Sequence, residues 1–135
     1  MNVLVAAYRS DAPQHEQARS WLEEAVNAGE PVGLSDAVVT GYVRVVTHPR
    51  VFDQPTPLAT ALGHVRTLLG SAGTLRVLPG RRHWEVVEEL CTAGDARGNL
   101  VADAAHAATA LEAGATWVTF DRDFARFPGL SWRSP

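Results

Sequence analysis

The stretch GNLVADAAHAATALEA, residues 98–113, decides the interpretation of this chain, together with TWVTFDRDF at residues 116–124. The first stretch has the apolar spacing of a buried helix and carries Asp103 within it. The second is a short apolar run typical of a buried strand, followed directly by Asp121 and Asp123. Acids are rarely buried without a partner, so acids on a helix and at the end of a strand indicate a cation site.

Short apolar strands alternate with helices along the chain, which predicts an α/β domain with a mostly parallel sheet. Ligands of such sheets bind at the carboxyl ends of the strands. We expect helices over residues 2–9, 14–28, 36–46, 57–69, 82–91, 100–113 and 121–127, and strands over 32–34, 75–78, 116–120 and 130–132. The third helix should be capped by Ser35 or Asp36 and the fourth by Thr56, while Trp21 and Trp84 should be core residues.

Length and composition limit the classes of protein that the chain can represent. Its 135 residues, 46 % of them hydrophobic, predict a single domain over residues 1–135. The net charge of −3 does not indicate a nucleic-acid partner. All twelve basic residues are arginines, however, and an arginine binds phosphate with two hydrogen bonds. No apolar run approaches the roughly 20 residues of a membrane span and no leader is recognised, so we expect a cytoplasmic protein. The single Cys91 cannot form an internal disulfide and should be a helix residue near the core.

The spacing of the acids suggests which of them could bind a cation. Hard cations such as Mg²⁺ take oxygen ligands, often one or two carboxylates with several waters. Asp103 and Asp121 could supply these, with Asp123 close enough to help. Structural roles remain open: Asp121 could cap the following helix, Asp123 could favour its dipole, and Asp103 could pair with a buried arginine.

These strings, with NVLVA at residues 2–6 and YVRVVTHPRVF at residues 42–52, resemble PIN-domain toxins of the VapC type over essentially the whole chain. The resemblance implies a PIN-like three-layer α/β/α domain and a metal-dependent endoribonuclease, the toxic half of a toxin–antitoxin pair. The implied partners are RNA, an antitoxin whose C-terminal arm occupies the active site, and a second copy in a homodimer. No membrane partner is implied.

The chain departs from the family pattern at two acids. The family's first acid ends an opening strand two residues before the Asn that matches Asn2, so both the acid and its strand would fall before Met1. We hypothesise that the start is wrongly assigned and expect the 135-residue form to be weakly active and poorly stable. The in-frame codons upstream of Met1 test this hypothesis, because they should encode a short apolar strand that ends in Asp. The family's second acid corresponds to Val39 here, and Asp36, about one helical turn earlier, either replaces it or only caps the helix.

The resemblance also suggests a mechanism and its participants. One or two Mg²⁺ or Mn²⁺ ions would be held by Asp103, Asp121 and the missing acid, while Asp123 or Asp36 orients a water or accepts its proton.

Four further residues are weighed beside these acids. Asn2 and Thr119 are candidates for substrate or partner contacts. Arg44 could also contact RNA or the antitoxin, or pair with an acid of the site, and the salt bridge is the favoured alternative. Asn99 is expected to cap its helix rather than to bind the metal.

Two other functions compete with the ribonuclease. A catalytically impaired PIN-like module would bind only its antitoxin or nucleic acid. A Mg²⁺-dependent hydrolase of small phosphoesters would carry an Asp-x-Asp loop after its first strand, whereas the pair here lies in the last third.

Overall fold

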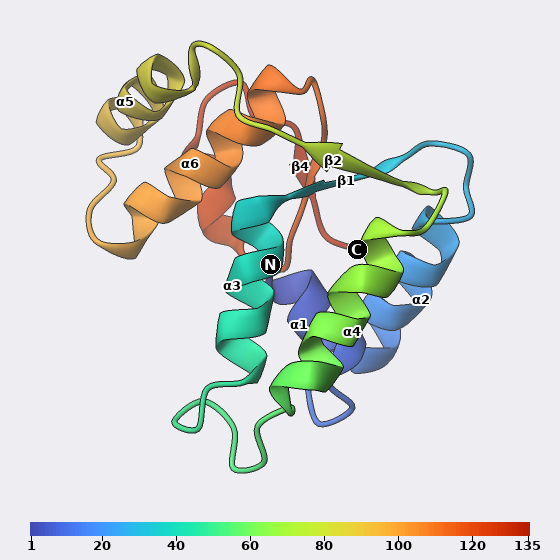
Figure 1. Cartoon of the computed structure of the whole chain (residues 1–135). Helices are drawn as coiled ribbons and strands as arrows, with labels where there is room; N and C mark the ends of the chain where they lie inside the picture. The colour runs from blue at the N-terminus through green and yellow to red at the C-terminus, as the bar shows by residue number, and fades with distance from the viewer. The chain divides into compact units, whose positions relative to one another are not determined.

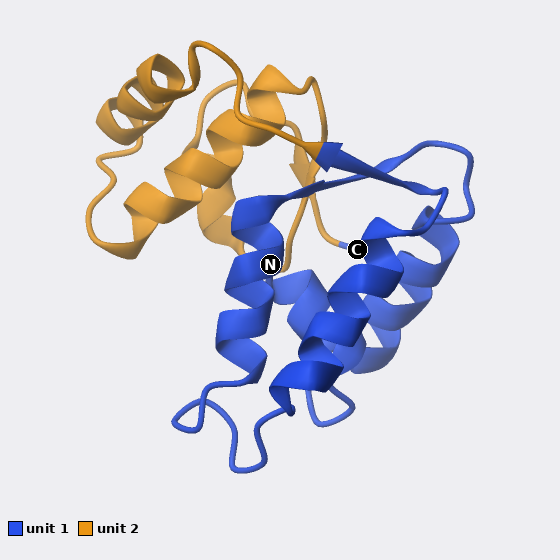
Figure 2. Ribbon diagram, in the orientation of Figure 1, with its two compact units in different colours: residues 1–76, 135 blue, residues 77–134 orange.

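The computed structural model describes residues 1–135, and Figure 1 shows its helices and strands. In chain order the elements are α1 (Asn2–Tyr8), α2 (His15–Ala25), β1 (Val32–Ser35), α3 (Asp36–Val46), α4 (Leu58–Leu69), β2 (Thr74–Val77), α5 (His83–Ala93), α6 (Asn99–Glu112), β3 (Trp117–Val118), the 3₁₀ helix η1 (Arg122–Arg126) and β4 (Trp132–Arg133). The predicted elements are therefore all present, with bounds that differ at their ends. The chain divides into two compact units, residues 1–76 with Pro135 and residues 77–134 (Figure 2).

Unit 1 is mainly helical. Helix α1 packs on α2 and α3, and α3 also packs on α4 and β1. Its buried apolar side chains come from α1, α2, β1, α3 and α4 and include Val3, Leu4, Ala18, Leu22, Leu34, Val38, Tyr42, Val46, Ala61 and Leu68. The apolar positions recur at three- and four-residue intervals in these helices, so each helix presents one apolar side to its neighbours.

Local sequence sets where the helices of unit 1 begin. Ser35 has extended backbone, and its Oγ accepts a hydrogen bond from the Val38 N–H at 3.3 Å. Ser35 is therefore the cap of α3, and Asp36 is the first helical residue. The expected Thr56 cap of α4 is wrong: Pro57 stands at that position without a side-chain cap, because the Thr56 hydroxyl accepts a hydrogen bond from Arg9 instead.

Unit 2 is built on α5 packed against α6. Three fully buried alanines of α6, Ala104, Ala107 and Ala108, let other elements approach its axis closely. The rings of Phe124 and Phe127 complete the same cluster and meet edge to face at 5.8 Å between centroids. The small residues of the 98–113 stretch therefore give a flat helix surface on which aromatic rings pack.

The strands form two two-stranded sheets, β1 with β2 and β3 with β4. Strands β3 and β4 are parallel, with Trp117 opposite Trp132 and Val118 opposite Arg133. Both strands are only two residues long, shorter than the sequence suggests, and η1 begins at Arg122, four residues after the end of β3. The predicted α/β class is confirmed.

One core prediction is wrong. Trp84 is 66 % exposed, because α5 turns Val87 and Leu90 towards the cluster and leaves Trp84 on the other side. Trp21 is half-buried, and Cys91 packs against the cluster as expected. None of the helices has the length and apolar content needed to cross a bilayer.

Candidate active site

Asp103 lies in the second turn of α6, in unit 2. The helix follows Gly98, whose φ of 58° is a conformation that glycine adopts at little cost. The Asp103 side chain is half-buried and forms no ion pair with an arginine or histidine. Burial, followed by the negative charges of Asp121 and Asp123, raises the pKa of the Asp103 carboxyl above its usual value. The expected alternative, a buried arginine beside Asp103, is not found.

Asp121 sits at the corner where β3 turns into η1. Its Oδ1 accepts a hydrogen bond from the Asp123 N–H at 2.9 Å, and its own N–H donates to the Thr119 hydroxyl at 3.1 Å. Thr119 itself is almost fully buried, and its N–H donates to the Arg133 carbonyl at 2.9 Å. Asp121 is therefore the predicted cap, and it is held in place from both directions. Its carboxylate forms no ion pair.

Asp123 differs from the other two acids of unit 2. It is exposed, and an Oδ1 lies 3.4 Å from an Arg126 nitrogen one turn along η1. It still contributes repulsion at Asp103, so the three carboxylates lie within electrostatic reach of one another. Asp103 and Asp121 thus form a pair of oxygen donors without a cationic side chain, which fits a hard divalent cation. No group of three or more His, Cys, Asp or Glu is arranged to hold a metal ion.

Asp36 belongs to unit 1, whereas the other three acids belong to unit 2. Its carboxylate accepts two hydrogen bonds from Arg76 of β2, at 3.0 and 2.6 Å, and both side chains are more than half exposed. The Arg76 guanidinium lowers the pKa of the Asp36 carboxyl, so this group stays ionised at neutral pH. The sequence did not foresee this pairing.

The remaining predicted residues lie at or near the ends of helices α1, α3 and α6. Arg44 is exposed near the end of α3 and forms no ion pair, so the expected salt bridge is wrong. Asn2 is the first residue of α1 and half-buried. Asn99 is the first residue of α6 rather than its cap, since Gly98 takes the cap position.

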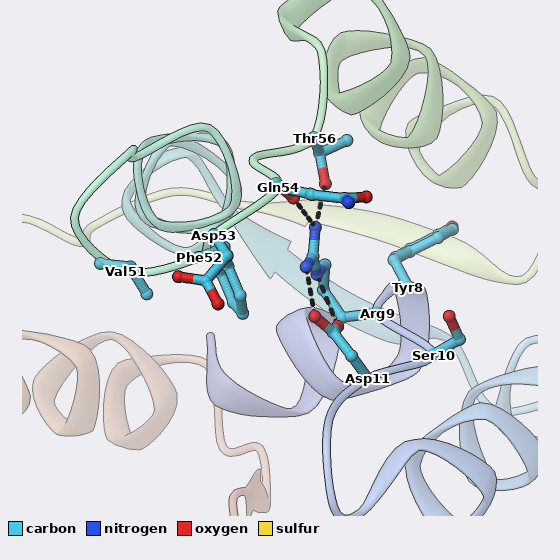
Figure 3. Close-up of a pocket in the computed structure, with 9 residues that line it drawn as sticks. All are labelled: Tyr8, Arg9, Ser10, Asp11, Val51, Phe52, Asp53, Gln54 and Thr56. Carbon is cyan, nitrogen blue, oxygen red and sulfur yellow. Dashed lines mark hydrogen bonds and ion pairs between the residues drawn. The ribbon is translucent and has the colours of Figure 1, made fainter.

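A pocket of about 600 Å³ in unit 1 lies between the end of α1 and the loop before α4 (Figure 3). Arg9 crosses it. Two of its N–H groups donate to the Asp11 carboxylate, at 2.8 and 2.5 Å. Two more N–H groups donate to the loop before α4: one to the Gln54 carbonyl at 2.8 Å and one to the Thr56 hydroxyl at 3.2 Å. Its Cζ also lies 4.0 Å from the centre of the Phe52 ring. None of the predicted site residues lines this pocket, and Arg9 acts as a clamp between two loops.

His106 is a second feature that the sequence did not signal. It lies one turn after Asp103 and stacks on Trp117, with ring centroids 5.3 Å apart. Burial lowers the pKa of His106 to about 4. The indole N–H of Trp117 is buried and has no hydrogen-bond partner, so this ring pair is held by packing. A neutral, stacked ring pair therefore lies one helical turn from Asp103.

Comparisons with known proteins agree with this architecture. A family model described as PIN domain matches residues 1–130. Ribonuclease VapC43 of Mycobacterium tuberculosis is 47 % identical over 135 residues, which is all of this chain and 92 % of that protein. Ribonuclease VapC25 of the same species is 37 % identical over 130 residues, covering 96 % of this chain and 92 % of that protein.

A solved structure has the same fold: the crystal structure of VapBC2 from Rickettsia felis bound to a DNA fragment from their promoter. It matches with a TM-score of 0.72 and 18 % identity, over 99 % of this chain and 94 % of that chain. The chain belongs to the PIN-domain family and, within it, to the VapC ribonucleases. The family resemblance of the sequence is thereby confirmed.

Proposed function

We propose that residues 1–135 act as a single PIN-like domain that hydrolyses RNA phosphodiester bonds, the toxin component of a toxin–antitoxin pair. The proposal rests on the relationship to named VapC ribonucleases and on one feature of unit 2. That feature is the pair Asp103 and Asp121, two carboxylates without a cationic side-chain partner whose charges repel each other.

A divalent cation, Mg²⁺ or Mn²⁺, is proposed to bind Asp103 and Asp121. When bound, such an ion lowers the pKa of a bound water and stabilises the charge that develops on the phosphate. The two carboxylates are held by different means. Asp103 is part of α6, whereas Asp121 donates its N–H to the Thr119 hydroxyl and accepts the Asp123 N–H at its Oδ1. Thr119 is proposed as a positioning residue, because its hydroxyl holds the backbone of Asp121.

Two further acids are proposed to be catalytic. Asp123 is exposed beside Asp121 and is proposed to accept a proton from the attacking water. Asp36 of unit 1, which is ionised next to Arg76, is proposed as the other catalytic acid.

The partners follow from the same family. We propose an RNA substrate, a cognate VapB-type antitoxin and a homodimer. Asn2 and Arg44 remain proposed contacts for substrate or antitoxin. Arg44 suits such a role because it is exposed and forms no ion pair.

The experiment is an RNA cleavage assay with EDTA, Mg²⁺ or Mn²⁺, combined with melting curves under the same conditions. We expect cleavage only with a divalent cation, and an increase in Tm on adding the cation. Asp103→Asn and Asp121→Asn should each lower cleavage by about 100-fold or more, because a ligand is lost. Both should also lose the Tm increase.

Asp95→Asn is the matched control within unit 2. Asp95 is exposed, pairs only with Arg97, and has a φ of 45°, which asparagine also tolerates. In unit 1, Asp36→Asn is compared with the exposed Asp53→Asn. Cleavage that survives EDTA, or that survives Asp103→Asn in a folded protein, would overturn the proposal. Antitoxin binding without any cleavage would favour the impaired module.

A further inference from the structure

Two arginines of unit 2 lie where β3 and β4 end. Arg133 is opposite Val118 in the parallel register, and its carbonyl accepts the Thr119 N–H at 2.9 Å. Arg122 follows Asp121 directly and is the first residue of η1. Because parallel strands end at the same edge of a sheet, both arginines border the corner that carries Asp121.

Neither arginine is engaged within the protein. Both are exposed, and neither forms an ion pair or a side-chain hydrogen bond. The contrast within unit 2 is clear, since Arg82, Arg97 and Arg126 each pair with a carboxylate. Two guanidinium groups, one directly after Asp121 and one at the end of β4, are thus left without a carboxylate partner.

The local contacts explain why Arg122 stays free next to two acids. The Asp121 Oδ1 is occupied by the Asp123 N–H, and Asp123 is paired with Arg126 on the next turn. Arg122 and Asp123 are adjacent within η1, and adjacent residues of a helix do not face each other, so the two do not pair.

The strand register gives a direction for Arg133. Trp117 and Trp132 form a register pair and pack against the core cluster of unit 2. Since side chains alternate along a strand, Val118 and Arg133 face the opposite side of the sheet.

We propose that Arg122 and Arg133 bind phosphate groups of the RNA on either side of the bond that is cleaved. This inference rests on the proposed function and names the contacts that position its substrate. RNA is a polyanion, and three carboxylates repel it. Guanidinium groups at the rim offset that repulsion and match the geometry of phosphate oxygens with two hydrogen bonds.

The test uses the purified full chain and a short, fluorescein-labelled single-stranded RNA. Cleavage kinetics with Mg²⁺ and RNA binding in EDTA are measured over a salt series for wild type, Arg122→Ala, Arg133→Ala and the double variant. Each single variant should raise KM and Kd about 5–10-fold, because one charge-assisted contact is lost. The slope of log Kd against log salt should become shallower by about 0.7 per lost phosphate contact. The value of kcat should stay nearly unchanged.

Arg81→Ala is the matched control, since Arg81 is also an exposed arginine of unit 2 without an ion pair, but lies before α5. It should change neither KM nor the salt slope. The inference is overturned if Arg122→Ala and Arg133→Ala behave like Arg81→Ala, or if they reduce kcat without changing KM and slope. If wild type cleaves no RNA with either cation, the proposed function fails, and the binding measurements in EDTA still decide the role of the two arginines.

Discussion

Arg9 provides the sharpest test of how unit 1 is held together. Its side chain is 12 % exposed and joins the end of α1 to the loop before α4 through the Gln54 carbonyl, the Thr56 hydroxyl and the Phe52 ring (Figure 3). The substitution Arg9→Ala removes all of these contacts together. It also leaves the Gln54 and Thr56 oxygens without this donor.

The magnitude follows from those contacts. Hydrogen bonds to a charged group contribute about 1.5–3 kcal/mol each when buried, and less when partly exposed. A cation over an aromatic face adds about 0.5–1 kcal/mol near the surface. The Asp11 carboxylate adds little to stability, because its side chain is 58 % exposed and solvent screens the pair. The free energy of unfolding should therefore fall by about 2–3 kcal/mol, and Tm by roughly 6–12 °C.

The assay is chemical and thermal unfolding of wild type, Arg9→Ala and the control Asp11→Asn. Asp11→Asn keeps the contacts to Gln54, Thr56 and Phe52, so it should cost well under half as much. Amide exchange adds a local measurement, since the Thr56 N–H donates to the Val46 carbonyl at 2.8 Å inside the clamped loop. That amide should lose protection in Arg9→Ala. The reasoning is refuted if Arg9→Ala and Asp11→Asn unfold alike.

Three further substitutions test other polar contacts of the two units. The folded-state pKa of His106 is about 4 and its ordinary value is 6.5, so between these two pH values the unfolded chain binds a proton that the folded chain does not. Lowering the pH from 6.5 to 4 should therefore reduce the free energy of unfolding by about 2–3 kcal/mol through His106. His106→Gln should remove that part of the pH dependence, measured as the slope of unfolding free energy against pH. Tyr42→Phe removes the hydroxyl that lies 2.6 Å from His64 Nδ1 and should cost about 1 kcal/mol in urea titrations. Gly80→Ala would place a Cβ 2.3 Å from Glu112 Oε1, but that oxygen ends a flexible side chain that can move aside, so the midpoint of denaturation should fall by less than that of Glu112→Ala, which removes the acceptor of the Gly80 N–H.

Most helices and strands could be located from the sequence, because their causes are local. Pro49 and Gly29 stand just after helices, Ser35 caps the next one, and the 3.6-residue apolar spacing continues between them. The errors occur where a distant contact overrides a local preference. Thr56 has the right residue type for a cap, but its hydroxyl is taken by Arg9, which lies 47 positions earlier. Trp84 fits an apolar helix pattern, yet only one side of α5 packs against the core, and Trp84 lies on the other side.

In the candidate site, too, the features set by local sequence could be predicted and those set by distant contacts could not. Asp103 and Asp121 could be found from their unusual surroundings, a run of small apolar residues and the end of a strand. The partner of Asp36 could not be found, because Arg76 meets it through the pairing of β1 with β2, which no local pattern specifies. The same holds for Arg122 and Arg133: their residue type is visible in the sequence, but their lack of partners is a property of the folded chain.

Asp121 shows why a structural role and a functional role are not competing explanations. One of its oxygens caps η1 through the Asp123 N–H, which fixes the orientation of the whole carboxylate. The second oxygen is left without an ion pair, and the charge of the carboxylate, after burial, helps to raise the pKa of Asp103. A carboxylate that is fixed by one oxygen and unpaired at the other is already oriented, so binding a cation there costs little side-chain entropy. The capping hydrogen bond is therefore part of what makes Asp121 a good candidate ligand.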